Sequence, residues 1–320
     1  MANRQLEVKD LRTYFFLRNS VLKAVDEVCI NIGEKEIVGI VGESGSGKTV
    51  TALSILRLVP FPGRIVTGEV IYKGRNLLEV EEIEMRKIRG KQISMVFQDP
   101  MTFLNPVMKV GDQIAESIMI HQGIEKKEAR EQAMRLLESV LIPSPEIIVD
   151  YYPHQLSGGM KQRILIAIAI SCGPSLIIAD EPTTALDVTV QMQILSMLKD
   201  IKNRLSTSIL LVTHDLGIVA GVCDRAYVMY AGKVAETGRV LDLYEDPLHP
   251  YTRGLLRSTL SIDEFKEELE TIEGYVPSLI SPPTGCRFNP RCPCSIEICR
   301  KEEPKLLSKK GKGVACWLYR

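Results

Sequence analysis

The chain has 320 residues, a length that predicts two domains at about 150 residues each. Hydrophobic residues make up 45% and charged residues 25% of the sequence, which is ordinary globular usage and excludes intrinsically disordered and collagen-like chains. The 40 Lys and Arg residues balance the 40 Asp and Glu residues, so the chain lacks the overall basic charge typical of nucleic-acid-binding proteins.

The N-terminal part of the chain predicts strands, then a glycine loop, then a helix. Its first residues, MANRQLEVKDLR, contain no apolar signal-peptide core, so we expect no export signal. Residues 1–50 are rich in strand-forming residues, and the apolar run 37–41 is typical of a buried parallel strand. The segment after Gly47 has helical spacing and ends at Pro60. This order predicts the start of an α/β domain.

A helical insertion is predicted over residues 100–172. Six apolar residues recur there at helical steps, which places them on one face of a helix. They are Ala129, Ala133, Leu136, Leu137, Val140 and Leu141. A second helix is predicted over 158–172, and the uncharged stretch 164–179 is broken by Gly173 and Pro174. About 18 continuous apolar residues are needed to cross a membrane, and the mean hydropathy is +0.04, so we expect a soluble, cytosolic chain.

The α/β pattern resumes after residue 175. It predicts a strand at 176–180, a helix near 188–204, a strand at 208–214 and further strand structure at 225–238. After PLHPYTRGLL at 247–256 the composition changes to Pro, Cys and charged residues. We therefore expect a domain boundary near residue 256.

Residues 42–49, GESGSGKT, satisfy the pattern G-x-x-x-x-G-K-[ST]. Glycines let the backbone wrap around a phosphate with its N–H groups pointing inward, and the following helix adds its positive N-terminal end. Lys48 would supply a charge for the β and γ phosphates, and the Thr49 hydroxyl would bind Mg²⁺. The alternative is a glycine turn before an ordinary helix, but the predicted strand before and helix after favour a phosphate-binding loop.

Two adjacent carboxylates follow the predicted strand LIIAD. Asp180 ends that strand and Glu181 comes next, and ligands bind at the carboxyl end of an open parallel sheet. Asp180 suits the surroundings of Mg²⁺, and Glu181 suits a residue that orients or deprotonates an attacking water. An acidic pair after a strand is by itself more often a helix N-cap. Together with the phosphate-binding loop it indicates a nucleoside triphosphatase.

Residues 156–162, LSGGMKQ, specify the kind of triphosphatase. They resemble the LSGGxxQ signature of ABC ATPases. Gln98 in VFQDP resembles the Q-loop glutamine of that family, residues 185–187 (ALD) its D-loop, and His214 in LLVTHD its H-loop histidine. The resemblance implies that the signature, with Ser157 as a helix N-cap, binds the γ phosphate of ATP held by the opposite subunit. Two nucleotides would then lie in a head-to-tail dimer.

The resemblance implies a role for each matched residue. Glu181, His214 and Gln98 would be catalytic, with His214 sensing the γ phosphate and Gln98 bridging Mg²⁺ and the attacking water. Thr49, Gln98 and Asp180 would bind Mg²⁺. The nucleotide-binding residues would be Tyr14, Phe15, Ser44, Gly45, Ser46, Gly47, Lys48, Thr49, Val50, Gln98, Asp180, Glu181 and His214. The residues acting on the partner's nucleotide would be Ser157, Gly158, Gly159, Gln162 and Asp187.

An aromatic side chain from the first strand is expected to stack on adenine. Phe15 fits the family's register counted from Leu11, and Tyr14 is its neighbour. The sequence does not separate these two residues, and an edge-strand aromatic with no ligand is the alternative.

Three strings resemble one subfamily, the ATPase subunits of dipeptide, oligopeptide and nickel importers. They are VGESGSGKT, VFQDPMTFLNPVMKVGDQI and DPLHPYTRGLL. This resemblance implies an ATP-hydrolysing motor of a peptide importer, peripheral on the cytoplasmic side of the cell membrane. Its partners would be a second ATPase subunit (a paralogue or a second copy), two permease subunits and, indirectly, an extracellular peptide-binding protein, with no nucleic acid. The alternatives are a nickel or other small-solute importer, or a soluble ABC ATPase acting on nucleic acid or ribosomes, which the zero net charge disfavours.

Five of the eight cysteines lie near the C-terminus. Clustered cysteines without an export signal indicate a metal centre before a disulfide framework. The tail also resembles the subfamily's C-terminal extension, whose C-x5-C-P-x5-C pattern with a later cysteine maps onto Cys286, Cys292, Cys299 and Cys316 and leaves Cys294 outside. No C-x-x-C pair of the kind common in zinc sites occurs, so the four thiolates favour a [4Fe–4S] cluster. Zinc and unliganded thiols are the alternatives.

Together these observations predict an α/β fold. It would contain a P-loop ABC ATPase core, with a RecA-like sheet and an antiparallel β subdomain, in residues 1–256. A helical insertion subdomain would lie at about 99–165. Residues 257–320 would form a small Cys-rich extension of the peptide-transporter type that binds a metal cluster, and the cofactors would be ATP, Mg²⁺ and that cluster.

Overall fold

The computed structural model describes residues 4–258 and 272–320, which form two compact units. The first unit is made of residues 4–33, 37–79, 211–258 and 272–320, and the second of 34–36 and 80–210. The predicted extension 257–320 belongs to the first unit, apart from residues 259–271, which lie outside the described residues. The boundary near residue 256 stays a prediction.

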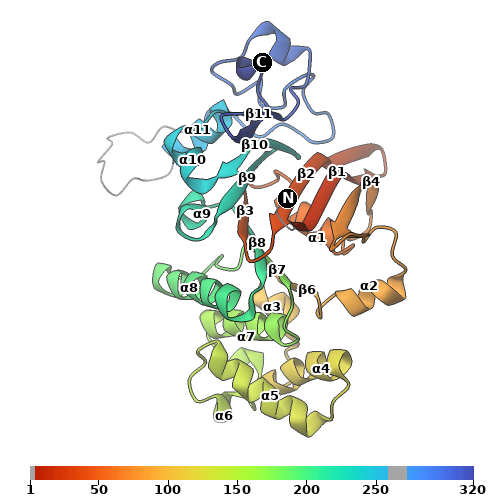
Figure 1. Ribbon diagram of the computed structural model, residues 1–320, viewed down its shortest axis with the longest axis vertical. Helices are drawn as coiled ribbons and strands as arrows, with labels where there is room; N and C mark the ends of the chain where they lie inside the picture. The colour runs from red at the N-terminus through yellow and green to blue at the C-terminus, as the bar shows by residue number, and fades with distance from the viewer. Residues whose placement is uncertain (1–3, 259–271) are drawn as a thin grey trace. The chain divides into compact units, whose positions relative to one another are not determined.

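An antiparallel sheet of the first unit contains the N-terminal strands in the order β2-β1-β4-β5, of which Figure 1 labels β2, β1 and β4. Leu6, Val8 and Leu11 of β1 are all buried, although strict alternation would turn Leu11 to the other face. A register irregularity between Val8 and Leu11 inserts a residue, with Asp10 at φ 44°, and restores the buried face. The strands are β1 (Arg4–Leu17), β2 (Ser20–Gly33), β4 (Gly63–Tyr72) and β5 (Arg75–Asn76).

A second set of strands in this unit has the order β11-β12-β10-β9-β3. Strand β3 (Ile37–Val41) is parallel to β9 and wholly buried, so the prediction of a buried parallel strand is confirmed. The predicted strand region 225–238 is an antiparallel pair, joined by a turn in which Ala231 and Gly232 take positive φ angles of 45° and 84°. The other strands are β9 (Arg225–Tyr230), β10 (Lys233–Arg239), β11 (Leu307–Lys309) and β12 (Lys312–Val314). Strand β8 (Ser208–Thr213) starts among the residues of the second unit and ends among those of the first.

The C-terminal tail shares the core of the first unit. Phe288 is buried with its ring centroid 5.1 Å from that of Tyr230 and 5.4 Å from that of Tyr251. Cys286 and Cys292 pack against the same cluster. Because β12 also pairs with β10, the tail extends this unit and does not enclose a separate core. The helices of the unit are α1 (Lys48–Ile55), α9 (Leu216–Val222), α10 (Val240–Glu245) and α11 (Pro250–Arg257), with short 3-10 turns η2 (Glu297–Arg300) and η3 (Trp317–Tyr319).

The second unit combines the parallel strands β6 and β7 with a group of helices, in which α4, α5 and α7 pack on one another (Figure 1). The predicted insertion is therefore helical, while its bounds at 99–165 stay a prediction. Within residues 4–258 and 272–320, no helix is both long and apolar enough to cross a membrane. The elements are α2 (Glu82–Ile88), β6 (Ile93–Val96), α3 (Pro100–Phe103), α4 (Val110–Gln122), α5 (Lys126–Ser139), α6 (Pro145–Ile148), η1 (Pro153–Gln155), α7 (Gly158–Ile170), β7 (Leu176–Asp180) and α8 (Val188–Leu205).

The predicted apolar face of α5 is wrong at its last position. The helix ends at Ser139, and the N–H of Ile142 donates to the carbonyl of Leu137 over 3.0 Å, as in a Schellman motif. Leu141 occupies the left-handed position of this motif, at φ 58°. Its side chain is therefore 68% exposed, whereas Leu137 is buried as predicted.

Candidate nucleotide site and cysteine tail

The loop between β3 and α1 has the backbone of a phosphate-binding turn. Gly47 is the N-cap of α1 and takes φ 97°, and a Cβ there would lie 2.3 Å from the carbonyl oxygen of Ala24. Only glycine fits this combination of positive φ and close approach. The N–H of Ser46 turns back to the carbonyl of Glu43 over 3.1 Å. The loop leads directly into the N-terminal end of α1, and a loop before a helix N-terminus is the arrangement that attracts phosphate.

Lys48 is held inside this loop. Its side chain is almost fully buried, and Nζ donates to the carbonyl of Gly42 over 2.8 Å and to that of Glu43 over 3.1 Å. The Oγ of Ser46 is buried and has no hydrogen-bond partner among the described residues. A buried hydroxyl without a partner is costly, and a phosphate oxygen would satisfy it. Thr49 and Val50 follow as partly buried residues of α1, and Ser44 and Gly45 form the exposed tip of the loop.

The two adenine-stacking candidates have different surroundings. Tyr14 donates its hydroxyl to Oδ1 of Asp26 over 2.7 Å, and Lys23 lies over its ring. Burial and the Asp26 hydrogen bond raise the pKa of Tyr14 to about 12. Phe15, the next residue on β1, is partly buried, and its ring lies against Gly63 of β4. Tyr14 is thus fixed by a polar network, and Phe15 is not.

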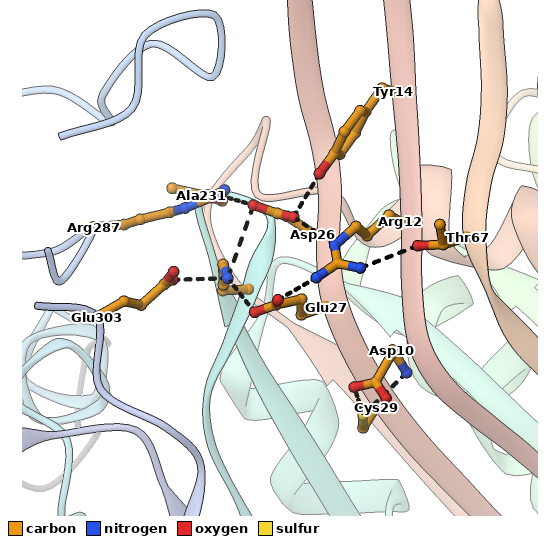
Figure 2. A network of polar contacts seen from close by, with 11 residues as sticks. Asp10, Arg12, Tyr14, Asp26, Glu27, Cys29, Thr67, Ala231, Arg287 and Glu303 are labelled. Carbon is orange, nitrogen blue, oxygen red and sulfur yellow. Dashed lines mark hydrogen bonds and ion pairs between the residues drawn. The ribbon is translucent and has the colours of Figure 1, made fainter. Parts of the chain in front are cut away.

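Asp26 is the centre of that network (Figure 2). Arg287 of the tail donates to its Oδ2 and to the carbonyl of Ala231, and Lys233 lies 3.8 Å from the same Oδ2. Burial acts to raise the pKa of Asp26, but the Tyr14 hydrogen bond and the charges of Lys233 and Arg287 hold it below its usual value. Arg287 therefore links the C-terminal tail to Asp26 on β2, next to Tyr14, one of the two adenine-stacking candidates.

In the second unit, the structure brings Gln98 and Glu181 together. Glu181 comes directly after β7 with φ 44°, and its Oε2 accepts from Nε2 of Gln98 over 3.1 Å and from Oγ1 of Thr184 over 2.9 Å. Asp180, the last residue of β7, is buried. Residues 83 positions apart are thus paired at the carboxyl end of a parallel strand.

The signature segment packs on the predicted D-loop region. Ser157 caps α7, with Oγ accepting from the N–H of Met160 over 3.3 Å. A Cβ at Gly158 would meet Leu186 at 3.6 Å, and one at Gly159 would meet Val190 at 2.8 Å.

Three further predicted site residues have distinct settings. Asp187 caps α8 through the N–H of Val190 over 2.9 Å. Gln162 is buried, and its Nε2 has no partner among the described residues. His214 is exposed directly after β8. The structure gives the positions of these three residues, and their roles at the nucleotide site stay predictions.

The cysteine pattern of the tail separates one residue from the other four. Cys299 and Cys316 are buried and Cys286 and Cys292 are half-buried, whereas Cys294 is exposed. The N–H of Cys286 donates to the carbonyl of Cys299 over 2.8 Å. The four cysteines that are buried or half-buried are therefore the same four that the C-x5-C-P-x5-C pattern, with its later cysteine, selects.

Two thiols of the tail are held in their protonated form. Burial, with a smaller effect of the neighbouring thiols, raises the pKa of Cys286 to about 12 and that of Cys292 to about 11. In the described ranges, no group of three or more His, Cys, Asp or Glu side chains is arranged to hold a metal ion. A metal would therefore have to draw the thiolates together and displace their protons.

Sequence reasoning missed a contact between the tail and the phosphate-binding loop. Arg291 forms a two-pronged ion pair with Glu43, Nη1 to Oε2 over 2.8 Å and Nη2 to Oε1 over 3.1 Å. The hydroxyl of Tyr251 accepts from the N–H of Glu43 over 2.9 Å. Glu43 occupies an unspecified position of the loop pattern, so no motif signals its partner.

These features define a P-loop nucleotide-binding protein. Residues 25–184 match the family described as ABC transporter, and residues 235–299 match the oligopeptide/dipeptide transporter C-terminal region. The oligopeptide transport ATP-binding protein AppD of Bacillus subtilis is 50% identical over 316 residues, covering 98% of this chain and 96% of that protein. The oligopeptide transport ATP-binding protein OppD of Salmonella typhimurium is 46% identical over 316 residues, covering 99% and 94%.

Solved structures show the same relationship. A dimeric ATP-binding cassette in a post-hydrolysis state, bound to ADP and Pi, is similar with a TM-score of 0.67 and 27% identity, covering 73% of this chain and 98% of that one. The chain therefore belongs to the ABC transporter family, and it is an ATP-binding, ATP-hydrolysing member. The predicted P-loop ABC fold is confirmed.

Proposed function

We propose that the chain is the ATP-hydrolysing motor subunit of an importer of dipeptides or oligopeptides. The observation that carries this proposal is the likeness to oligopeptide transport ATP-binding proteins along 98–99% of the chain. The matched C-terminal region, residues 235–299, adds weight because it is described by that transport class. The proposed location is the cytoplasmic side of the cell membrane, peripheral to two permease subunits.

The proposed work of each residue follows from its chemistry. Lys48 and the N–H groups of the loop bind the β and γ phosphates, while Thr49, Gln98 and Asp180 would hold Mg²⁺, which neutralises phosphate charge. Glu181 orients the attacking water and accepts its proton. The hydrogen bond from Gln98 fits this role, because it fixes the direction of the Glu181 carboxylate at the end of β7.

Further proposed contacts complete the nucleotide site. We propose Phe15 for adenine stacking, since Tyr14 is held by Asp26. His214 would contact the γ phosphate. Ser157 and the signature glycines would bind the γ phosphate held by a second copy or a paralogous subunit, so that two ATP molecules join a head-to-tail dimer.

A mixing experiment tests the dimer. Lys48→Ala removes the phosphate charge of a subunit's own site, and Ser157→Arg blocks the site that its signature completes on the partner. A mixed dimer then contains one site with both defects and one with neither. We expect each variant alone to be inactive and the mixture to recover part of the ATPase activity. No recovery would contradict action on the partner's nucleotide.

A transport experiment tests the cargo. Cells that express the chain with its membrane subunits and peptide-binding protein should take up a labelled dipeptide or tripeptide, and the Lys48→Ala variant should abolish this uptake. Uptake of ⁶³Ni²⁺ but not peptide would favour the nickel-importer alternative. ATPase activity stimulated by nucleic acid or ribosomes would favour a non-transport ATPase.

We further propose that Cys286, Cys292, Cys299 and Cys316 bind a [4Fe–4S] cluster. Their burial beside the exposed Cys294, and the backbone hydrogen bond between Cys286 and Cys299, support the choice of these four. Such a cluster would tie the tail together where it has few apolar residues of its own. Zinc bound by the same thiolates is the alternative.

A further inference from the structure

An acidic residue lies inside the phosphate-binding loop. Glu43 follows directly after Gly42, and its own backbone donor and acceptor are both occupied. Its N–H donates to Tyr251, and its carbonyl accepts from the N–H of Ser46 and from Nζ of Lys48. The backbone at Glu43 is therefore fixed, and its side chain is the part that can turn towards or away from a bound phosphate.

Arg291 holds that side chain from the tail. Both terminal nitrogens of Arg291 contact the Glu43 carboxylate, and the Arg291 side chain is only 5% exposed. A guanidinium fork matches the two oxygens of a carboxylate, so the pair is specific in direction as well as in charge.

The rest of the guanidinium is fixed by the protein. Its Nε donates to the carbonyl of Glu273 over 3.0 Å, its Nη2 to that of Ile272 over 3.1 Å, and its Nη1 to the hydroxyl of Tyr230 over 3.3 Å. Arg291 also lies against the Tyr230 ring. These contacts fix the Arg291 guanidinium without a ligand. It is therefore already in position to pair with the Glu43 carboxylate.

A free carboxylate at this position would oppose the ligand. ATP carries several negative charges, and like charges repel strongly where protein excludes water. We propose that Arg291 is a positioning residue of the ATP site, which neutralises Glu43 and holds its carboxylate away from the phosphates. This inference rests on the proposed nucleotide site and adds to it a residue of the C-terminal extension.

Two single variants and their combination test the proposal, with ATP dissociation constants measured on the full chain. Arg291→Ala exposes the Glu43 charge, so we expect ATP to bind roughly three- to ten-fold more weakly. Glu43→Gln leaves the Arg291 charge unbalanced near the phosphates, so we expect tighter binding than in the wild type. The double variant Glu43→Gln/Arg291→Ala should return close to the wild-type value.

Controls separate charge from architecture. Arg300→Ala removes an equal charge from an exposed site in the same tail and should leave the affinity unchanged. Arg291→Lys keeps the charge but loses the two-pronged contact, so it should weaken ATP binding less than Arg291→Ala does, and it serves if the alanine variant does not fold. The loss in Arg291→Ala should be larger for ATP than for ADP, and it should shrink as salt is raised.

The contrary outcomes are distinct. If the double variant binds ATP as weakly as Arg291→Ala, Arg291 acts by holding the tail in place and the proposal is overturned. Wild-type affinity in Arg291→Ala at low salt would also overturn it. If the wild-type chain itself binds no ATP, the nucleotide site fails, which is a separate result.

Discussion

Gln98 donates a hydrogen bond from Nε2 to Oε2 of Glu181 over 3.1 Å, and Thr184 donates to the same oxygen. Glu181 stands at φ 44°, a conformation that costs a non-glycine residue on the order of 1 kcal/mol. The chain therefore holds one carboxylate oxygen with two donors at a strained position.

Glu181→Gln should separate ATP binding from hydrolysis. The amide keeps the size of the side chain but cannot accept a proton, so we expect turnover to fall by roughly 100-fold or more while ATP binding persists. Turnover measured by phosphate release, together with nucleotide binding on the same sample, checks this. Asp200→Asn, which changes an exposed acid on α8, is the matched control for loss of charge. Normal hydrolysis by Glu181→Gln would remove Glu181 from the proposed role.

Gly47→Ala should destroy the phosphate-binding loop. The new Cβ would lie 2.3 Å from the carbonyl oxygen of Ala24 at φ 97°, so the loop has to move. Gly74→Ala is the control, because Gly74 also has positive φ, at 81°, but no atom lies within 4 Å of its Cβ position and it lies outside the nucleotide site. We expect Gly74→Ala to lose about 1 kcal/mol of stability and to retain ATP binding, and Gly47→Ala to lose binding. Equal behaviour of the two variants in thermal unfolding and ATP binding would contradict the clash.

Folding stability should fall as the pH drops from 6.5 towards 4, because of His249. Burial lowers the pKa of this residue to about 4 from its usual 6.5, and a hydrogen bond with the Ala315 backbone only partly offsets the effect. Below pH 6.5 the unfolded chain binds a proton that the folded chain does not, so the folded state loses about 3 kcal/mol by pH 4. Unfolding in urea at several pH values measures this slope.

His249→Asn is the control for the pH experiment. In the native chain, Nδ1 of His249 accepts from the N–H of Tyr251 over 3.0 Å, and asparagine offers an acceptor in a similar place without titrating. The variant should show a shallower loss of stability between pH 6.5 and 4. An unchanged slope would assign the acid sensitivity to other groups.

The cysteine variants should divide into two classes. Serine at position 286, 292, 299 or 316 replaces a soft thiolate by a hard oxygen, so protein purified without air should lose iron and acid-labile sulfide. Cys294→Ser should keep both, since Cys294 is exposed and outside the pattern. ATP binding should survive in all five variants. Stoichiometric zinc without sulfide in the native protein would replace the cluster with a zinc site, and no metal at all would contradict both.

Local patterns predicted most of the fold. The five-residue run Ile37–Val41 is a buried parallel strand, and α7 begins after Ser157 as its capping residue predicts. Each of these depends on neighbours in the chain, which a reader of the sequence can see. The end of α5 was misread because a Schellman motif can place any residue that tolerates positive φ at its turn, and Leu141 occupies that position.

Long-range pairs could not be predicted. The contact of Arg291 with Glu43 joins two charged residues with no shared motif, and either residue alone reads as an exposed side chain. The pairing of β10 with β12 is similar, because the short strand Lys312–Val314 has too few residues to show an alternating pattern. Packing in three dimensions selects these partners. The cysteine pattern indicates a metal-binding function for the tail, but it does not indicate which residues the tail contacts.

The contact between Glu43 and Arg291 can form only late in the synthesis of the chain. The two residues are 248 positions apart, and at ribosomal speeds of 5–20 residues per second the second is made roughly 10 to 50 s after the first. Throughout that interval Glu43 lacks the counter-charge that Arg291 supplies in the folded chain. A chain that stops early, or loses its tail to a protease, keeps that bare acid and also leaves the edge of β10 unpaired. The charge balance of the phosphate-binding loop therefore depends on the presence of the C-terminal tail.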